Sequence, residues 1–283
     1  MRSSLVLSTL VACLVASASP AGAAKKSTVA AAAEPATFES KVAGLERREG
    51  LITIHVDGKA GRILFELPAP ARPRGEVGRF LYVEGLLTGL GSNPVGLDRG
   101  QLGATRLVIL RRVGGRLLIE QPNLFYRALT DNPTERVAVE QSFATSVLWA
   151  GAIEAEAGDG RLLIDMTSFI ARDAHRVAAT LKASKQGSYE LDADRSVPIP
   201  DACLAFPDNV ELEALLTFGG SEPGSNVRQV TPTPESITLV QHHSFLRLPD
   251  DGYRPREFDP RAGSFEVGFQ DHAAALTLPW IVA

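Results

Sequence analysis

The chain has 283 residues, of which 45% are hydrophobic and 22% charged, and its formal net charge is −4 at pH 7. These values are typical of a folded soluble protein and leave ample apolar material for a core. The mild negative charge excludes a strongly basic nucleic-acid-binding surface, and an aromatic content of 6% argues against base-stacking platforms. No nucleic-acid partner is therefore expected.

The N-terminus carries the pattern of an export signal. Arg2 supplies a positive charge, residues 5–15 are apolar, and residues 21–23 are small, as a signal peptidase requires. Residues 1–23 are predicted to be a signal peptide, which places the mature protein in the periplasm or outside the cell. The alternative is a lipid anchor, because Cys13 follows a short apolar run of the kind used in bacterial lipoproteins, and only its acylation would give a membrane partner.

The remaining chain divides into three further parts. Residues 24–44 are predicted to be a disordered, alanine-rich linker, residues 45–272 a β-rich domain, and residues 273–283 a divergent tail. Alternating apolar residues and intervening turn residues predict strands and hairpins in the domain. The strands are expected at 52–57, 63–67, 80–84, 105–112, 116–120, 147–154, 161–165, 211–218 and 236–246.

One segment has a helical rather than a strand period. Residues 167–184 predict a single helix with Ser168 as its N-cap. Hairpins that follow one another along the chain indicate antiparallel pairing. The predicted fold class is therefore mainly β (α+β), with antiparallel, hairpin-rich sheets or a sandwich and one or two helices.

A glycine-rich loop at 85–103 suggests a phosphate-binding loop, but its spacing contradicts that interpretation. Pro94 follows Gly89 and Gly91 closely, and no Gly-Lys-Ser/Thr sequence closes the run. A strand at 105–110 follows the loop, so no helix N-terminus is available to hold a phosphate. Tight backbone geometry is the better explanation of these glycines.

The histidine and cysteine residues do not form a recognisable catalytic or metal-binding pattern. Cys203 is the only cysteine after the signal and is expected to be a small buried apolar group. His242 and His243 are adjacent on a predicted strand, so they point to opposite faces and make a poor chelate. The chain contains no His-Glu-x-x-His motif.

Two further clusters have ordinary structural explanations. Asp192, Asp194 and Asp201 could offer oxygen ligands to calcium, but the segment lacks the glycine and closing glutamate of an EF-hand and is expected to be a solvated loop. Arg172, Asp173 and His175 lie on the predicted helix without a Gly-x-Ser-x-Gly elbow, so a salt-bridged surface is expected. No catalytic, cofactor-binding or metal-binding residue is assigned.

Several short strings resemble one known family when they are taken in their order along the chain. They are GLGSNPVGLDRG (89–100), QPN (121–123), YRA (126–128), SFATS (142–146), FIARDAH (169–175), DRS (194–196), AFP (205–207) and DPR (259–261). In this order they resemble the N-terminal region of large bacterial exported zinc-dependent metalloproteases. That region is itself classed as a domain of unknown function, and the resemblance covers residues 45–271.

The resemblance implies that the chemistry lies elsewhere. In that family the zinc motif belongs to a later, metzincin-like catalytic domain, beyond the part matching 259–261. Zinc is therefore expected only in the catalytic domain, which would be the partner, and no cofactor is expected in this chain. The charged, proline-rich stretch at 254–265 would be the seam between the two domains. Because 273–283 no longer resembles the family, we expect a truncated or frameshifted reading frame.

These expectations give two hypotheses for function. In the first, the chain is a non-catalytic N-terminal accessory domain that scaffolds, shields or helps to fold an exported zinc metallopeptidase. In the second, it is a stand-alone periplasmic binding or interaction protein. A direct hydrolase has no supporting set of residues.

Overall fold

The computed structural model describes residues 37–71, 73–250, 252–254, 259, 261, 268–272 and 281–282. The expected signal peptide with Cys13, the expected linker as far as residue 36, and nearly all of the expected tail lie outside these residues. In the described ranges no helix has the length and apolar character needed to cross a membrane.

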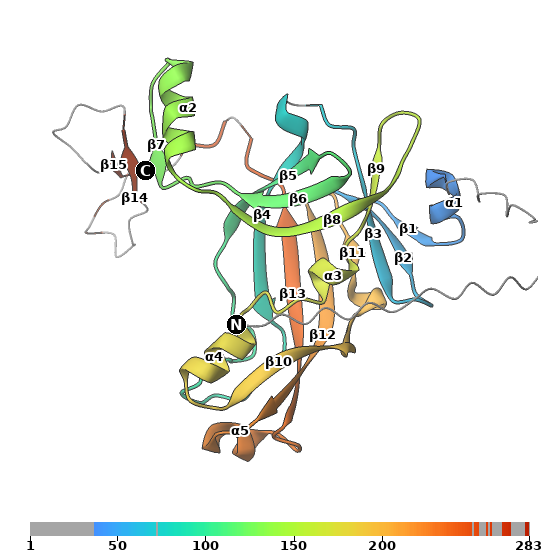
Figure 1. Ribbon diagram of the computed structural model, residues 1–283, viewed down its shortest axis with the longest axis vertical. Helices are drawn as coiled ribbons and strands as arrows, with labels where there is room; N and C mark the ends of the chain where they lie inside the picture. Colours follow the sequence, from blue (N-terminus) through green and yellow to red (C-terminus); the bar gives the residue numbers. More distant parts are fainter. Residues whose placement is uncertain are drawn as a thin grey trace, which may run out of the picture. The chain divides into compact units, whose positions relative to one another are not determined.

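The described chain is mainly β, and most strands form one antiparallel sheet that curls around its core (Figure 1). The order in this sheet is β1-β2-β3-β9-β8-β6-β5-β4-β13-β12-β10, with β11 also paired to β12. Its strands are β1 (Glu46–Arg48), β2 (Thr53–Asp57), β3 (Arg62–Leu67), β4 (Glu76–Leu86), β5 (Arg106–Val113), β6 (Arg116–Gln121), β8 (Ser146–Glu156), β9 (Leu162–Asp165), β10 (Ser188–Pro198), β11 (Leu204–Ala205), β12 (Asn209–Ser221) and β13 (Ser236–Leu246).

The predicted hairpins and antiparallel pairing are confirmed. β2 pairs with β3, β5 with β6, and β8 with β9, each across the turn that the sequence indicates. The sheets do not form a sandwich, because these hairpins are joined edge to edge within the single curled sheet. A second, small sheet of order β15-β14-β7 contains β7 (Tyr126–Arg127), β14 (Gly268–Asp271) and β15 (Ile281–Val282).

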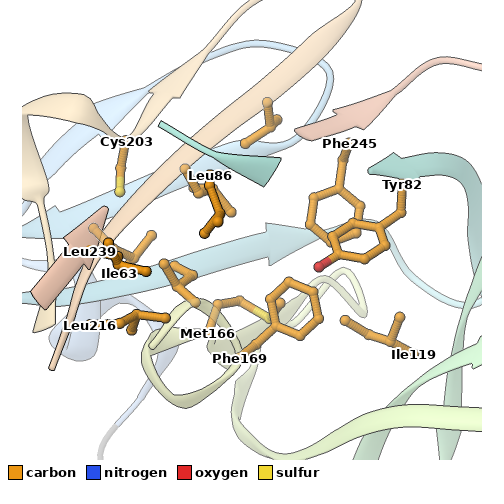
Figure 2. Close-up of a cluster of buried hydrophobic side chains, with 14 of the residues drawn as sticks. Ile63, Tyr82, Leu86, Ile119, Met166, Phe169, Cys203, Leu216, Leu239 and Phe245 are labelled. Atoms are coloured by element: carbon orange, nitrogen blue, oxygen red, sulfur yellow. The ribbon is translucent and has the colours of Figure 1, made fainter. Parts of the chain in front are cut away.

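The core lies on the concave face of the curled sheet, where alternate strand residues are buried. Figure 2 shows Tyr82, Phe169 and Phe245 packed together in this core. The centroid of the Tyr82 ring lies 5.1 Å from that of Phe245 and 5.5 Å from that of Phe169. Such aromatic pairs each contribute about 1 kcal/mol beyond simple burial.

The curl brings the chain around β1 and β2 against the segment around β11. The Leu51 N–H donates to the Phe206 carbonyl at 2.7 Å, and Arg48 Nη1 donates to the Pro200 carbonyl at 2.8 Å. A Cβ atom at Gly50 would lie 2.6 Å from backbone atoms of Phe206. Only glycine therefore permits this close approach, which joins the two ends of the sheet.

The helices are short and are distributed over the sheet. They are α1 (Phe38–Val42), α2 (Pro133–Ser142), α3 (Thr167–Ile170), α4 (Val177–Ala183) and α5 (Ser225–Val230), with 3-10 turns at Pro73–Gly75 and Pro200–Ala202. The sequence predicts only one or two helices. The folded region also begins earlier than the expected boundary at residue 45, because Phe38 of α1 is buried with Leu64 and Leu163 on the convex side of the sheet.

The single helix predicted at 167–184 is wrong. The segment forms α3 and α4, separated by a turn. Ser168 is not an N-cap; its hydroxyl accepts a hydrogen bond from the Trp149 indole at 3.1 Å. The Asp173 carboxylate instead accepts hydrogen bonds from the Val177 and Ala178 amides, at 2.7 and 3.0 Å, and so caps α4.

The solvated loop expected at 191–201 is also largely wrong, because most of it belongs to the edge strand β10. The strand pairs with β12, but its register shifts between Asp192 and Val197. Within this bulge the Asp192 carboxylate accepts from Arg195 Nε at 2.8 Å. A charged, bulged strand lacks the regular alternation that identifies a strand in sequence.

Candidate functional site

The most distinctive group of polar side chains lies inside the sheet, under the turn between α3 and α4. Two of its members come from β13, whose inward positions are otherwise apolar. Gln241 and His243 occupy inward positions between Leu239 and Phe245, and both are 0% exposed. Since buried polar groups need hydrogen-bond partners, these two residues must be matched by polar groups on the segment that covers them.

Gln241 holds the backbone of the turn between the two helices. Its side-chain oxygen accepts from the Ala174 and His175 amides at 3.0 and 2.9 Å. Its side-chain nitrogen donates to the Arg172 carbonyl at 2.8 Å. One amide side chain thus binds three backbone groups of the turn, of which the Ala174 amide and the Arg172 carbonyl also bond to each other at 2.8 Å.

His243 connects the end of α3 to β4. Its Nε2 lies 2.9 Å from the Ile170 carbonyl, and its Nδ1 lies 2.8 Å from the Tyr82 hydroxyl. Because a carbonyl only accepts, the Ile170 contact favours a proton on Nε2, with Nδ1 accepting from the Tyr82 hydroxyl. The 2.9 Å contact between this Nε2 and the Gln241 side-chain nitrogen is then not a hydrogen bond. Burial, together with the nearby Arg172 cation, lowers the pKa of His243 to about 3, so the imidazole is neutral.

Arg172 places its guanidinium group beside this chain of hydrogen bonds. Its Nη2 donates to the Tyr82 hydroxyl at 3.0 Å, and the guanidinium carbon lies 4.4 Å from the centroid of the Phe169 ring. Its buried Nε has no hydrogen-bond partner among the described residues. The aromatic face therefore supplies much of the stabilisation that a carboxylate would otherwise give.

A buried ion pair lies next to the network on the inner face of the sheet. Glu84 is directly opposite His243 in the β4–β13 register, and its carboxylate accepts from Arg106 Nη1 at 2.5 Å. Gly103 lies over this carboxylate, where a Cβ atom would be 2.1 Å from Oε1. Burial lowers the pKa of the neighbouring His175, although the negative charge of Glu84 acts to raise it. The Glu84 carboxylate is thus enclosed by the fold, whereas the Arg106 side chain remains 23% exposed.

These groups bind and orient the chain but do not form a reactive centre at neutral pH. The neutral His243 is a poor base, and burial raises the pKa of Tyr82, which remains a phenol. The hydroxyl of Tyr82 donates to His243 and accepts from Arg172, so it is occupied as well. The network instead holds the turn over the core through hydrogen bonds from Gln241 and His243.

The cysteine and the histidine pair behave as the sequence predicts. Cys203 is buried, and burial raises the pKa of its thiol to about 11, which is unsuitable for a nucleophile. His243 faces the core, whereas His242 lies on the outer face. There the His242 Nε2 lies 2.5 Å from the Glu211 carboxylate and its Nδ1 lies 3.5 Å from that of Glu213.

The remaining candidate ligands are not brought together. Asp192 pairs with Arg195, and Asp194 and Asp201 lie exposed, outside any cluster. Among the residues that the structure describes, no group of three or more His, Cys, Asp and Glu side chains could hold a metal ion. Asp173 caps α4, and His175 contributes its backbone amide to Gln241.

The glycine-rich loop serves backbone geometry, as predicted. A Cβ atom at Gly89 would lie 2.4 Å from the Arg99 amide nitrogen, where the two arms of the loop meet. The Leu90 amide donates to the Leu97 carbonyl at 2.8 Å, which holds the arms together. The loop is therefore folded back on itself.

Sequence reasoning missed Tyr82, Glu84 and Gln241, and it expected Arg172 on a salt-bridged helix surface rather than against Tyr82 and Phe169. One signal was available, since Gln241 and His243 stand at the inward positions of a strand whose other inward residues are apolar. Two polar residues at core positions of one strand predict a buried polar network, although not its partners.

Comparison with known proteins gives one match. The family model of a domain of unknown function, DUF5117, matches residues 100–276. No curated protein and no solved structure matches the chain. The matched part starts after β4, so it takes in most of the curled sheet and the turn that covers the polar network.

Proposed function

The chain belongs to the DUF5117 family, a domain of unknown function, and we propose that it is the non-catalytic N-terminal accessory domain of an exported zinc-dependent metallopeptidase. The proposal is supported by the ordered strings between 89 and 261, which resemble that region of the metalloproteases. In this role the domain is exported by its signal and scaffolds, shields or helps to fold the catalytic domain. An acylated Cys13 would be the alternative route to the cell envelope.

The non-catalytic role is supported by one observation: each potentially reactive side chain already has a structural role. Cys203 is a protonated, buried thiol, His243 is neutral and doubly hydrogen-bonded, and the Asp173 carboxylate caps a helix. Each group has a structural function that a catalytic function would disturb. The zinc chemistry in this proposal therefore belongs to the catalytic domain.

Two expression experiments test the proposal, one with this chain alone and one with the downstream catalytic domain. We expect the purified chain to bind no stoichiometric zinc and to leave casein intact, and we expect the downstream catalytic domain to be soluble and active only when this domain is expressed with it. Stoichiometric zinc with proteolysis by the chain alone would overturn the proposal. A downstream sequence without His-Glu-x-x-His, together with a stable monodisperse chain, would instead favour the stand-alone interaction protein.

A further inference from the structure

A groove of about 410 Å³ opens where β5 begins and β6 ends. One wall is formed by the start of β5 and the residue before it, and the other by the end of β6 and the segment that follows it. Ala144 and Ser146, where β8 begins, complete the lining. Leu124 and Phe125 line it with 42% and 41% exposure. The groove thus combines a strand edge with accessible apolar side chains.

The strand edge in this groove has one unpaired residue, Leu107, and the sequence explains why. β5 and β6 pair from Val113–Arg116 at the two-residue turn as far as Ile109–Glu120. Hydrogen-bonded pairs alternate from such a turn, so the odd-numbered residues of β5 bond toward β6. The next pair would join Leu107 to Pro122, and proline has no N–H to donate.

The Leu107 N–H and C=O therefore point into the groove. Among the described residues no strand pairs with β5 on this side before Ile109. On the other side β4 already pairs with Arg106–Val108, through Tyr82, Leu81 and Phe80. The unpaired N–H and C=O of this one residue can hydrogen-bond to an added extended chain, as in β-addition.

The charged side chain in the groove favours an extended chain that carries a carboxylate. Arg106 is the only ionisable side chain that lines it, and no carboxylate is among the described lining residues. Arg106 uses Nη1 for its contacts with Glu84 and the Ala104 carbonyl, and its side chain remains 23% exposed. A carboxylate on an incoming chain can approach the rest of this guanidinium group.

We propose that this groove binds an extended acidic peptide segment, which adds a strand to β5 beside Leu107 and places a carboxylate near Arg106. The flanking Leu124 and Phe125 contact alternate side chains of the added strand. The proposal is independent of the metallopeptidase role, because it rests on the strand edge and the charge of the groove alone.

Hydrogen exchange and peptide binding test the proposal on the wild-type chain. The probe is a short fluorescein-labelled peptide of alternating valine and threonine with one central glutamate. We expect saturable binding by fluorescence anisotropy and slower exchange of the Leu107 amide in the complex. The Val108 amide, which bonds toward β4, is the internal control and should not change. Absence of binding, or binding that leaves Leu107 exchange unchanged, would overturn the proposal.

Two matched comparisons separate the backbone and charge contributions. Leu107→Pro removes the groove-facing donor and should weaken binding by about tenfold, whereas Leu107→Ala keeps the donor and should bind nearly as well as the wild type. Replacing the peptide glutamate by glutamine should weaken binding about fivefold. Equal affinities of the two peptides would overturn the acidic preference. If Leu107→Pro does not fold, the hydrogen exchange of the wild-type Leu107 amide tests the backbone contribution instead.

Discussion

The two faces of β13 carry adjacent histidines in opposite electrostatic environments. His243, on the inner face, is fully buried and is held neutral between the Ile170 carbonyl and the Tyr82 hydroxyl. His242, on the outer face, lies between the carboxylates of Glu211 and Glu213. Hydrogen bonding to Glu211 raises the pKa of His242, whereas burial lowers that of His243.

This difference shows that position in a strand, rather than residue type, decides what a histidine does. Two side chains one residue apart differ in burial because successive strand residues point to opposite faces. The inner residue fixes a turn over the core, while the outer one contributes a partly exposed ion pair. Changes at the inner face should therefore have large effects on stability, and changes at the outer face small ones.

The largest effect is expected from Gln241→Leu, which removes a side chain that satisfies three backbone groups. The substitution leaves the His175 amide without its partner and removes the side-chain partner of the Ala174 amide and the Arg172 carbonyl, which then keep only their bond to each other, at 2.8 Å. We expect the free energy of unfolding in urea to fall by about 3–5 kcal/mol.

The matched control for this prediction lies on the outer face of the same strand. Val240→Leu, a change of apolar shape at a partly exposed position, should alter the free energy of unfolding by less than about 0.5 kcal/mol. If Gln241→Leu were no more destabilising than Val240→Leu, the polar network would not be what holds the turn.

Acidification is the second way to disturb the inner face. The pKa of His243 is about 3 in the folded state, and its unfolded value is near 6.5, so the unfolded state binds more protons between these values. The contribution of neutral His243 to the free energy of unfolding is therefore fully present above about pH 6.5, and it is lost as the pH falls toward 3. At pH 5 the loss is about 2 kcal/mol.

Urea unfolding at several pH values measures this loss in the wild type and in His243→Asn, which cannot titrate. We expect the wild type to lose stability more steeply than the variant between pH 6.5 and pH 5. A His243 ring that titrates near pH 6 in the folded protein, observed by NMR, would contradict the buried neutral state.

Tyr82→Phe is expected to have a smaller effect because the aromatic packing is kept. The substitution removes one hydroxyl and leaves Arg172 Nη2 and His243 Nδ1 without that partner. We expect destabilisation of about 1–2 kcal/mol in urea unfolding. Tyr189→Phe is the control, since its hydroxyl makes one hydrogen bond, to the Pro234 carbonyl, and should cost less. Equal losses would argue against a cooperative inner network.

The parts of the fold that follow from local pattern were predictable, and those that depend on distant contacts were not. Regular alternation with a turn between strands predicted the β2–β3, β5–β6 and β8–β9 hairpins. The edge strand β10 escaped prediction because it is charged and bulged. α2 does carry its signals, with Asn132 accepting from the Thr134 amide as N-cap and proline at the first turn.

The candidate site also depends on contacts between residues that are distant in sequence, which local patterns do not predict. The helical period of 167–184 does not reveal that the backbone of its centre is held by Gln241, which is 67 residues away from Ala174 in sequence. The opposite faces of His242 and His243 follow from the period of a strand alone. Their partners Tyr82 and Glu211 come from other strands, and only the sheet order brings them together.

The smallest effect is expected on the outer face, from His242→Gln. The folded pKa of His242 is raised, so its stabilising contribution is fully present below about pH 6.5 and is lost as the pH rises through the folded value. Because the ion pair is partly exposed, we expect a loss of at most about 1 kcal/mol at pH 6 and less in high salt. The pH dependence therefore has the opposite sign to that of His243. NMR titration of the two rings in one sample measures both signs, and a His242 pKa below its ordinary value would show that the carboxylates of Glu211 and Glu213 do not govern it.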